Sequence, residues 1–209
     1  PRPAPRTLPF TRADFQDEVI KELCEAIEQG HDLRIEKSRD MRLTWTVLMV
    51  FLYYWQFRGM TFLVGSRKAE EVDMIGDLDT LLPKVRFMIE KQPKWLLPKG
   101  FDLEKHSNWM NVVNPETKGT ISGESNNANF ATGGRRNAVL FDEFSKWENT
   151  DHAAWVSAGA NTPCRIAVST PNFKNNYFFS LKKQSIKNLT VHWSRDSVKA
   201  AGLKDVEGN

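Results

Sequence analysis

The sequence has little cysteine and histidine, and neither residue type is spaced like a set of metal ligands. Its two cysteines, Cys24 and Cys164, lie far apart among 209 residues and form no C-x-x-C pair. This pattern suggests neither a disulfide framework nor a zinc site, and a reducing compartment fits best. The four histidines have no aspartate or cysteine at ligand spacing, so a metal–histidine site is not expected.

The sequence also lacks a long apolar run and a targeting segment. Its longest apolar stretch, residues 47–57, contains Tyr53, Tyr54 and Gln56 and is shorter than the ~20 residues that a membrane-spanning helix needs. The stretch predicts a buried core helix, and no membrane partner is expected. The first five residues have neither a methionine nor the apolar segment of a signal peptide. We therefore expect the chain to be part of a longer protein.

The composition is that of a soluble globular protein. Hydrophobic residues make up 40% and charged residues 26% of the chain, and the length suits one large domain. A net charge of +3 permits an anionic partner such as nucleic acid but does not require one. Several of the seven tryptophans lie inside apolar runs without regular basic neighbours, so we interpret most of them as core residues rather than as a base-stacking surface.

Strand and helix patterns alternate along the chain, which predicts a wound α/β sheet. The expected helices cover residues 13–27, 44–57, 80–91, 153–160 and 177–184, and a further helix is expected to open with Ser66 as its N-cap. The expected strands cover 33–36, 61–64, 137–141, 165–169 and 189–193, with a hairpin at 110–113 and 119–122. The strand at 137–141 is apolar on both faces, which is typical of a central parallel strand.

The strongest local signal for chemistry is a pair of carboxylates, Asp142 and Glu143, directly after that central strand. Ligands bind at the carboxyl ends of the strands of a parallel sheet. Phosphoryl transfer to water needs one carboxylate near Mg²⁺ and a second group that orients the attacking water. Asp142 would then serve the metal ion and Glu143 the water. The alternative interpretation is a strand that ends in a solvated acidic turn.

A candidate phosphate loop lies upstream, between the strand at 33–36 and the helix at 44–57. Thr44 would supply the hydroxyl for Mg²⁺, and the helix amino terminus would favour phosphate. The loop matches the motif G-x-x-x-x-G-K-[ST] only at this hydroxyl. Lys37, Arg39 or Arg42 could replace the missing lysine as a phosphate ligand. The alternative interpretation is an ordinary basic loop that connects the strand to the helix. The candidate nucleotide-binding residues of the loop are Lys37, Ser38, Arg39, Asp40, Met41, Arg42, Leu43 and Thr44.

Three further features could belong to the same site, and each has an ordinary alternative. Ser169 and Thr170 follow another apolar strand and could sense the γ-phosphate, or they form a simple turn. Arg135 and Arg136 precede the acidic strand after two glycines and could act as an arginine finger, as a DNA contact or as a solvated basic loop. Gln16 on the first helix could contact an adenine edge, or it faces water.

Taken in order, these motifs resemble those of the large terminase subunits of tailed bacteriophages. The resemblance rests on Lys-Ser-Arg-Asp-Met before an apolar helix, on Leu-Phe-Asp-Glu-Phe and on Ser-Thr-Pro-Asn, and it spans roughly residues 10–193. The segment 38–41 looks like the leading half of the Ser-Arg-x-x-Gly-Lys-Thr loop of that family. This chain departs from the family at Arg42 and Leu43, where family members keep Gly-Lys.

The resemblance implies a three-layer P-loop NTPase of the ASCE type with a mainly parallel sheet flanked by helices. It implies that Asp142 and Glu143 are the Walker B aspartate and the catalytic glutamate, and that residues 169–171 are the coupling motif. Gln16 would be the adenine-contact glutamine and Arg39 the loop arginine that touches phosphate. Arg135 or Arg136 would be the finger.

The implied activity is ATP hydrolysis with Mg²⁺, coupled to movement of double-stranded DNA. The implied partners are a portal protein, a small terminase subunit and further copies of the chain in a ring on the procapsid, in the host cell cytoplasm. We expect an ATPase domain at residues 1–193 and, from 194 to 209, the start of a linker toward a nuclease domain. Two rival functions are a helicase-like ATPase and a decayed P-loop domain that acts as a DNA-binding or assembly module.

Overall fold

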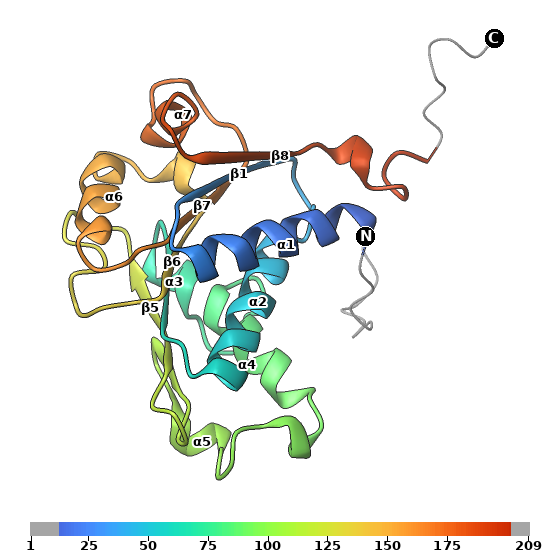
Figure 1. The fold of residues 1–209 in the computed structure, drawn as a ribbon, viewed down its shortest axis with the longest axis vertical. Helices are drawn as coiled ribbons and strands as arrows, with labels where there is room; N and C mark the ends of the chain where they lie inside the picture. The colour runs from blue at the N-terminus through green and yellow to red at the C-terminus, as the bar shows by residue number, and fades with distance from the viewer. Residues whose placement is uncertain (1–12, 202–209) are drawn as a thin grey trace.

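A computed structural model describes residues 13–201 of the chain. They form three layers, with a sheet between two layers of helices (Figure 1). The helices are α1 (Asp14–Gln29), α2 (Leu43–Arg58), α3 (Ala69–Val72), α4 (Leu81–Glu90), α5 (Leu103–His106), α6 (Asp151–Gly159) and α7 (Tyr177–Leu181), with 3₁₀ turns η1 (Lys94–Leu96), η2 (Phe144–Lys146) and η3 (Trp193–Arg195). The strands are β1 (Leu33–Lys37), β2 (Phe62–Ser66), β3 (Ser107–Asn108), β4 (Asn111–Val113), β5 (Thr120–Ser125), β6 (Ala138–Asp142), β7 (Arg165–Ser169) and β8 (Lys187–Val191).

The eight strands form one mixed sheet in the order β3-β4-β5-β2-β6-β7-β1-β8. The strands from β5 to β8 in this order run parallel to their neighbours. At the other edge, β4 pairs antiparallel with β5 and β3 pairs antiparallel with β4. The expected hairpin is confirmed as the pair β4 and β5. The expectation for residues 137–141 is also confirmed, because β6 lies between two parallel strands and all five of its residues are buried.

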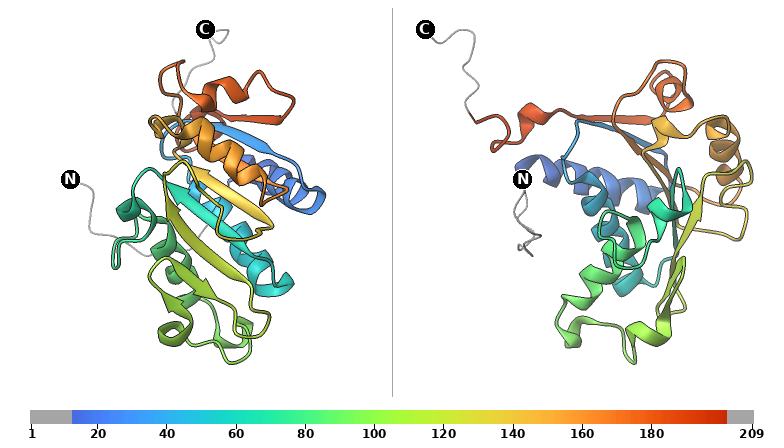
Figure 2. Two further views of the ribbon diagram at one scale, coloured as in Figure 1. Left: turned by 90° about the vertical axis from the view of Figure 1, so that its left-hand side faces the viewer. Right: turned by 180° about the vertical axis from the view of Figure 1, so that it is seen from behind.

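Each face of the sheet has its own apolar core. On one face, α1, α2 and α4 cover the sheet around side chains such as Val47, Phe51 and Ile166. On the other face, α6 and α7 lie over an aromatic cluster that includes Phe141 and Trp155. The two helix layers are seen on opposite sides of the sheet in Figure 1 and again in the turned views of Figure 2. The apolar run at residues 47–57 lies inside α2, as expected for a buried core helix.

Local chemistry sets the ends of the long helices. Helix α1 begins with a capping box in which the Gln16 side chain accepts from the Ala13 amide, and it ends at Gly30 in the left-handed conformation that glycine adopts readily. The expected helix at Ser66 is wrong in its start, because Ser66 is the last residue of β2 and only the short α3 follows, capped at Lys68. Within residues 13–201, no helix combines the length and the apolar character needed to cross a membrane.

Candidate functional site

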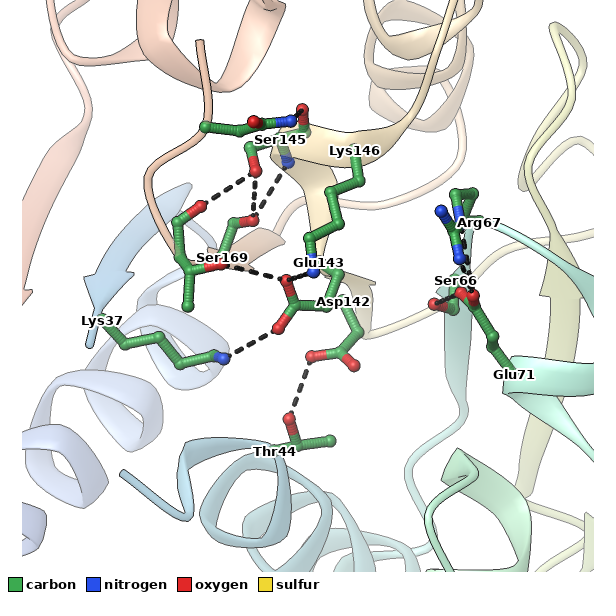
Figure 3. A network of polar contacts seen from close by, with 12 residues as sticks. Lys37, Thr44, Ser66, Arg67, Glu71, Asp142, Glu143, Ser145, Lys146 and Ser169 are labelled. Carbon is green, nitrogen blue, oxygen red and sulfur yellow. Dashed lines mark hydrogen bonds and ion pairs between the residues drawn. The ribbon is translucent and has the colours of Figure 1, made fainter. Parts of the chain in front are cut away.

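The candidate site lies where three neighbouring parallel strands end. Lys37 is the last residue of β1, Asp142 the last of β6, and Ser169 the last of β7. Because β7 pairs with both β1 and β6, the three carboxyl ends meet at one edge of the sheet. The amino terminus of α2, which starts at Leu43, faces the same place. Figure 3 shows the side chains from these elements pointing toward one another.

Glu143 is held by three donors from three different segments of the chain. Its Oε1 lies 2.9 Å from Lys37 Nζ, and its Oε2 lies 2.9 Å from Lys146 Nζ and accepts from Thr170 Oγ1 at 3.3 Å. Burial acts to raise the pKa of Glu143, but the two lysines outweigh burial, and the pKa lies below its usual value. The backbone of Glu143 is left-handed, with φ 49°, a strained conformation for a residue with a side chain. Such strain occurs at functional sites.

Asp142 is buried beside Glu143. Its Oδ1 accepts a hydrogen bond of 3.0 Å from Thr44 Oγ1 at the start of α2, and its backbone carbonyl accepts from Trp147 Nε1. Burial raises the pKa of Asp142 to about 6, and the neighbouring Glu143 adds to this, while Lys37 opposes it. A buried carboxylate of this kind gains from a cation beside it.

The residues present fit a magnesium ion of the kind that accompanies a nucleotide. Thr44 Oγ1 donates to Asp142 Oδ1 at 3.0 Å, so a hydroxyl and a carboxylate oxygen, both of the kind that Mg²⁺ accepts as ligands, lie side by side. Among the described residues, no group of three or more His, Cys, Asp or Glu side chains could hold a metal ion. Mg²⁺ sites commonly use one or two protein oxygens, with phosphates and water completing the shell.

The buried charge of Asp142 predicts that Asp142→Asn stabilises the metal-free protein at neutral pH. The native carboxyl binds its proton more tightly than an unfolded one, whose pKa is 3.8. The stabilising contribution of the protonated carboxyl is therefore complete below pH 3.8 and is lost as the pH rises through about 6. We expect the variant to gain about 1–3 kcal/mol in the free energy of unfolding at pH 7.

Urea denaturation at pH 7 and at pH 4, without nucleotide or Mg²⁺, measures this gain. It should shrink toward pH 4. The exposed Glu148 offers a matched control, Glu148→Gln, which should leave stability unchanged at both pH values. A less stable Asp142→Asn protein at pH 7 would contradict the assignment of a destabilising buried charge.

The candidate phosphate loop has the backbone of a glycine-containing loop without the glycines. Asp40 and Arg42 both adopt left-handed conformations, with φ 58° and φ 57°. Arg42 occupies the position of the second motif glycine. Its left-handed backbone explains why the motif has glycine there, because glycine adopts positive φ without steric cost. The Arg42 side chain makes no cap to α2, and the amides of the first turn of α2 are the usual partners of a phosphate.

The structure separates the candidate loop residues by where their side chains lie. Met41 and Leu43 are each 1% exposed and belong to the core. Arg39 and Asp40 are exposed. Among the three candidate cations, Lys37 is the one placed against Glu143, with its side chain 9% exposed.

The burial of Leu43 predicts that restoring the motif lysine does not restore a phosphate ligand. A lysine at this position would carry its charge into the apolar layer under α2. We expect Leu43→Lys to lower the free energy of unfolding by about 2–5 kcal/mol and to leave nucleotide affinity no higher. Denaturant titration measures the first effect. The conservative Leu43→Met should lose less than about 1.5 kcal/mol, and a stable Leu43→Lys protein with tighter nucleotide binding would show that this side chain turns to the phosphates.

Two residues of the site were not found from the sequence. Ser145 donates from its backbone amide to Ser169 Oγ at 3.1 Å and from its Oγ to the Thr170 carbonyl at 2.9 Å. Lys146 holds Glu143 from the following turn, η2. These bonds tie the strand-end pair Ser169 and Thr170 to the segment after Glu143. A basic residue three positions after the glutamate was the available signal, but it becomes meaningful only once η2 is known to turn back.

Gln16 is buried at the start of α1. Its side chain is fully buried, its carbonyl accepts from the Ala13 amide, and its Nε2 donates to Thr46 Oγ1 at 2.9 Å. Thr46 Oγ1 in turn donates to the Arg42 carbonyl. Gln16 is therefore linked through Thr46 to the backbone of the phosphate loop. An adenine contact by Gln16 stays a prediction that would require these bonds to change.

Within one chain, Arg135 and Arg136 lie at the opposite end of β6 from the acidic pair. Both residues precede the amino end of β6, whereas Asp142 stands at its carboxyl end. A five-residue strand separates the two ends by about 15 Å. The backbone amide of Arg136 donates to the Asn161 carbonyl, and burial lowers the pKa of the Arg136 guanidinium group. A finger supplied to a neighbouring subunit stays a prediction.

A surface hollow lies at the other end of the strands from the candidate site, at the amino ends of β1, β7 and β8. Two of its charged side chains, Arg165 and Asp32, are paired with each other, and its Lys187 pairs with Glu22. It contains none of the residues of the phosphate loop or the acidic pair. The carboxyl edge is therefore the better candidate site on chemical grounds.

The fold and the site together define an α/β domain with its polar site at the carboxyl ends of parallel strands. Solved structures with a similar fold include bacteriophage large terminases. The terminase of bacteriophage HK97 matches with a TM-score of 0.62 and 14% identity over 98% of this chain and 43% of its own. Two structures of the large terminase from a thermophilic bacteriophage also match with TM-scores of 0.62. One has 11% identity and the other, in complex with ADP, 12%.

The two matches to the thermophilic phage protein each cover 94% of this chain. The chain spans about half the length of the terminases that it matches, from 43% to 51%. The terminase fold implied by the sequence motifs is thus confirmed. No protein-family model and no curated protein matches the chain.

Proposed function

We propose that this chain is a P-loop ATPase domain of the ASCE type that drives DNA packaging as part of a viral large terminase. The observation that carries the proposal is the meeting of Lys37, Thr44, Asp142, Glu143 and Thr170 at one edge of the sheet. The order of the strands supports it, because β7, which ends at Ser169 and is followed by Thr170, lies between β1, which leads into the loop, and β6, which leads into the acidic pair. The likeness to terminase structures, one of them with ADP, points the same way.

The proposed roles follow from the contacts. The amides at the start of α2 and the ammonium group of Lys37 hold the phosphates, since both present positive charge at the carboxyl edge. Thr44 and Asp142 hold Mg²⁺, which would supply positive charge to the phosphate oxygens. Glu143 orients the attacking water, a role that suits a carboxylate kept ionised by its neighbours.

Hydrolysis requires Lys37 to leave Glu143. In the structure the ammonium group of Lys37 lies 2.9 Å from the Glu143 carboxylate, which would have to orient the water. The phosphate groups of a nucleotide carry more negative charge than the Glu143 carboxylate, and they would compete with it for the ammonium group of Lys37. Lys146 and Thr170 then keep Glu143 in place. The double-stranded DNA, portal protein, small subunit, ring of copies and host cytoplasm are part of the same proposal.

Phosphate release from ATP by the purified chain, with Mg²⁺ and with EDTA in its place, tests the proposal. We expect turnover with Mg²⁺ and none with EDTA, and a higher rate with double-stranded DNA. Nucleotide binding without turnover would point to an activity that needs a neighbouring subunit. The absence of both nucleotide binding and turnover would favour the decayed module. The burial of Leu43 and the ion pair between Arg42 and Asp196 are also compatible with that alternative.

A further inference from the structure

The chain after β8 packs against the candidate phosphate loop. We call residues 192–200 the strap. Figure 1 shows the chain continuing past the carboxyl end of β8 into η3, and β8 is the edge strand beside β1, which leads into the loop. The strap therefore starts next to the residues that would bind phosphate, although the two segments lie far apart in the sequence.

Three strap residues each contact a different loop residue. The amide of Trp193 donates to Ser38 Oγ at 3.0 Å, and Lys199 Nζ donates to the Arg39 carbonyl at 2.7 Å. Asp196 Oδ2 lies 3.3 Å from Arg42 Nη2. The hydrogen bond from the Ser38 amide to the carbonyl of Val191, the last residue of β8, extends this line of contacts. The strap thus follows the loop over much of its length.

The ion pair is the part of this contact that a nucleotide can disturb. Asp196 is 4% exposed, and its other oxygen accepts from the Val198 amide at 3.0 Å, so its carboxylate is fixed and needs a cation. The Arg42 side chain is 39% exposed, and Arg42 is the N-cap residue of α2, at the helix end where phosphate would bind. A phosphate group there competes with Asp196 for the same guanidinium group, because both are anions that arginine binds well.

We propose that the strap is a latch that reports the occupancy of the phosphate loop to the chain beyond it. Arg42 turns from Asp196 toward bound phosphates, and the strap loosens. Because coupling between two equilibria is reciprocal, a fastened strap must lower nucleotide affinity by the same factor. This inference rests on the proposed nucleotide site and concerns its regulation.

The test uses ADP with Mg²⁺ and the variant Asp196→Asn, in which asparagine keeps an acceptor for the Val198 amide but loses the charge. We expect ADP to bind about 5–20-fold more tightly to the variant, within the usual range of coupling between sites. Hydrogen exchange of the amides of residues 192–200 should rise when ADP is added to the wild type. In the variant it should already be high without ADP. The neighbouring Ser197→Ala, at an exposed position, should change neither quantity.

A double-mutant cycle separates the latch from simple repulsion between Asp196 and phosphate. In an Arg42→Gln background the change at Asp196 should have little effect on ADP affinity if the effect passes through the guanidinium group. An effect that persists there overturns the latch. So does ADP binding to the wild type with unchanged exchange in the strap. If Asp196→Asn does not fold, Arg42→Gln alone must raise exchange in the strap without ADP, and failure to do so also overturns the latch.

These outcomes differ from failure of the proposed function. In that case neither the wild type nor any variant binds ADP, so there is no nucleotide site to regulate and the latch falls with it. Intact ADP binding with an unresponsive strap overturns the latch alone.

Discussion

Glu143→Gln should abolish Mg²⁺-dependent ATP hydrolysis while leaving nucleotide binding nearly intact. Loss of a group that orients or deprotonates the attacking water lowers the rate by about 10²–10⁴-fold. Glutamine is nearly the same size and can still accept from Thr170 Oγ1, but it loses the charge that pairs with Lys37 and Lys146. Freed from Glu143, Lys37 is more available for phosphate, so ADP affinity should hold or rise.

Single-turnover phosphate release and ADP titration on the same preparation measure the two effects. The control is Glu148→Gln on the same segment, at an exposed residue, which should hydrolyse ATP like the wild type. An unchanged rate in Glu143→Gln would remove Glu143 from the mechanism. Loss of ADP binding together with activity would instead indicate a structural role for the carboxylate.

Lys37→Ala should weaken nucleotide binding more than any other single change of a cation in the loop. A charge-assisted hydrogen bond contributes about 1.5–3 kcal/mol, which corresponds to a loss of about 10–150-fold in affinity. The physical reason is position, because the buried side chain of Lys37 ends at the carboxyl edge of β1, beside the acidic pair. Arg39→Ala, at an exposed position, should have a smaller effect.

Lys146→Ala provides the matched control for Lys37. Both lysines lie 2.9 Å from Glu143, but Lys146 approaches from η2 and not from the phosphate loop. We expect Lys146→Ala to keep ADP affinity and to reduce the rate of hydrolysis, because Glu143 loses a support. Titration of all three variants with ADP and Mg²⁺ decides the matter. Equal affinity losses at the two lysines, or a larger loss at Arg39, would contradict the assignment of Lys37 as the phosphate ligand.

Much of the fold could be predicted from local patterns. The apolar strand at 137–141, the helix at 44–57 and the hairpin at 110–122 each carry their signal within a few residues, and each is present. The start of the helix after Ser66 could not be predicted in this way. Serine is a good N-cap in isolation, but pairing with β5 extends β2 through Ser66 and delays the helix.

Part of the candidate site could also be predicted from local patterns, and part could not. Asp142 and Glu143 could be proposed from the sequence because they directly follow an apolar strand, and the order of motifs around them indicated the terminase fold. The sequence left three cations open as phosphate ligands, and it showed only that Arg135 and Arg136 precede the acidic strand. The extended strand β6 separates these arginines from the acidic pair, because each residue of a strand adds about 3.3 Å.

By itself the sequence determined the alternation of elements, the acidic pair and the departure of the loop from the usual motif, because these are properties of neighbouring residues. Only the tertiary structure decided that Lys37 faces Glu143, that Leu43 belongs to the core, and that Asp196 reaches Arg42. The reason is physical. Parallel strands bring distant carboxyl ends to one edge, and which side chain points there depends on packing across the whole sheet.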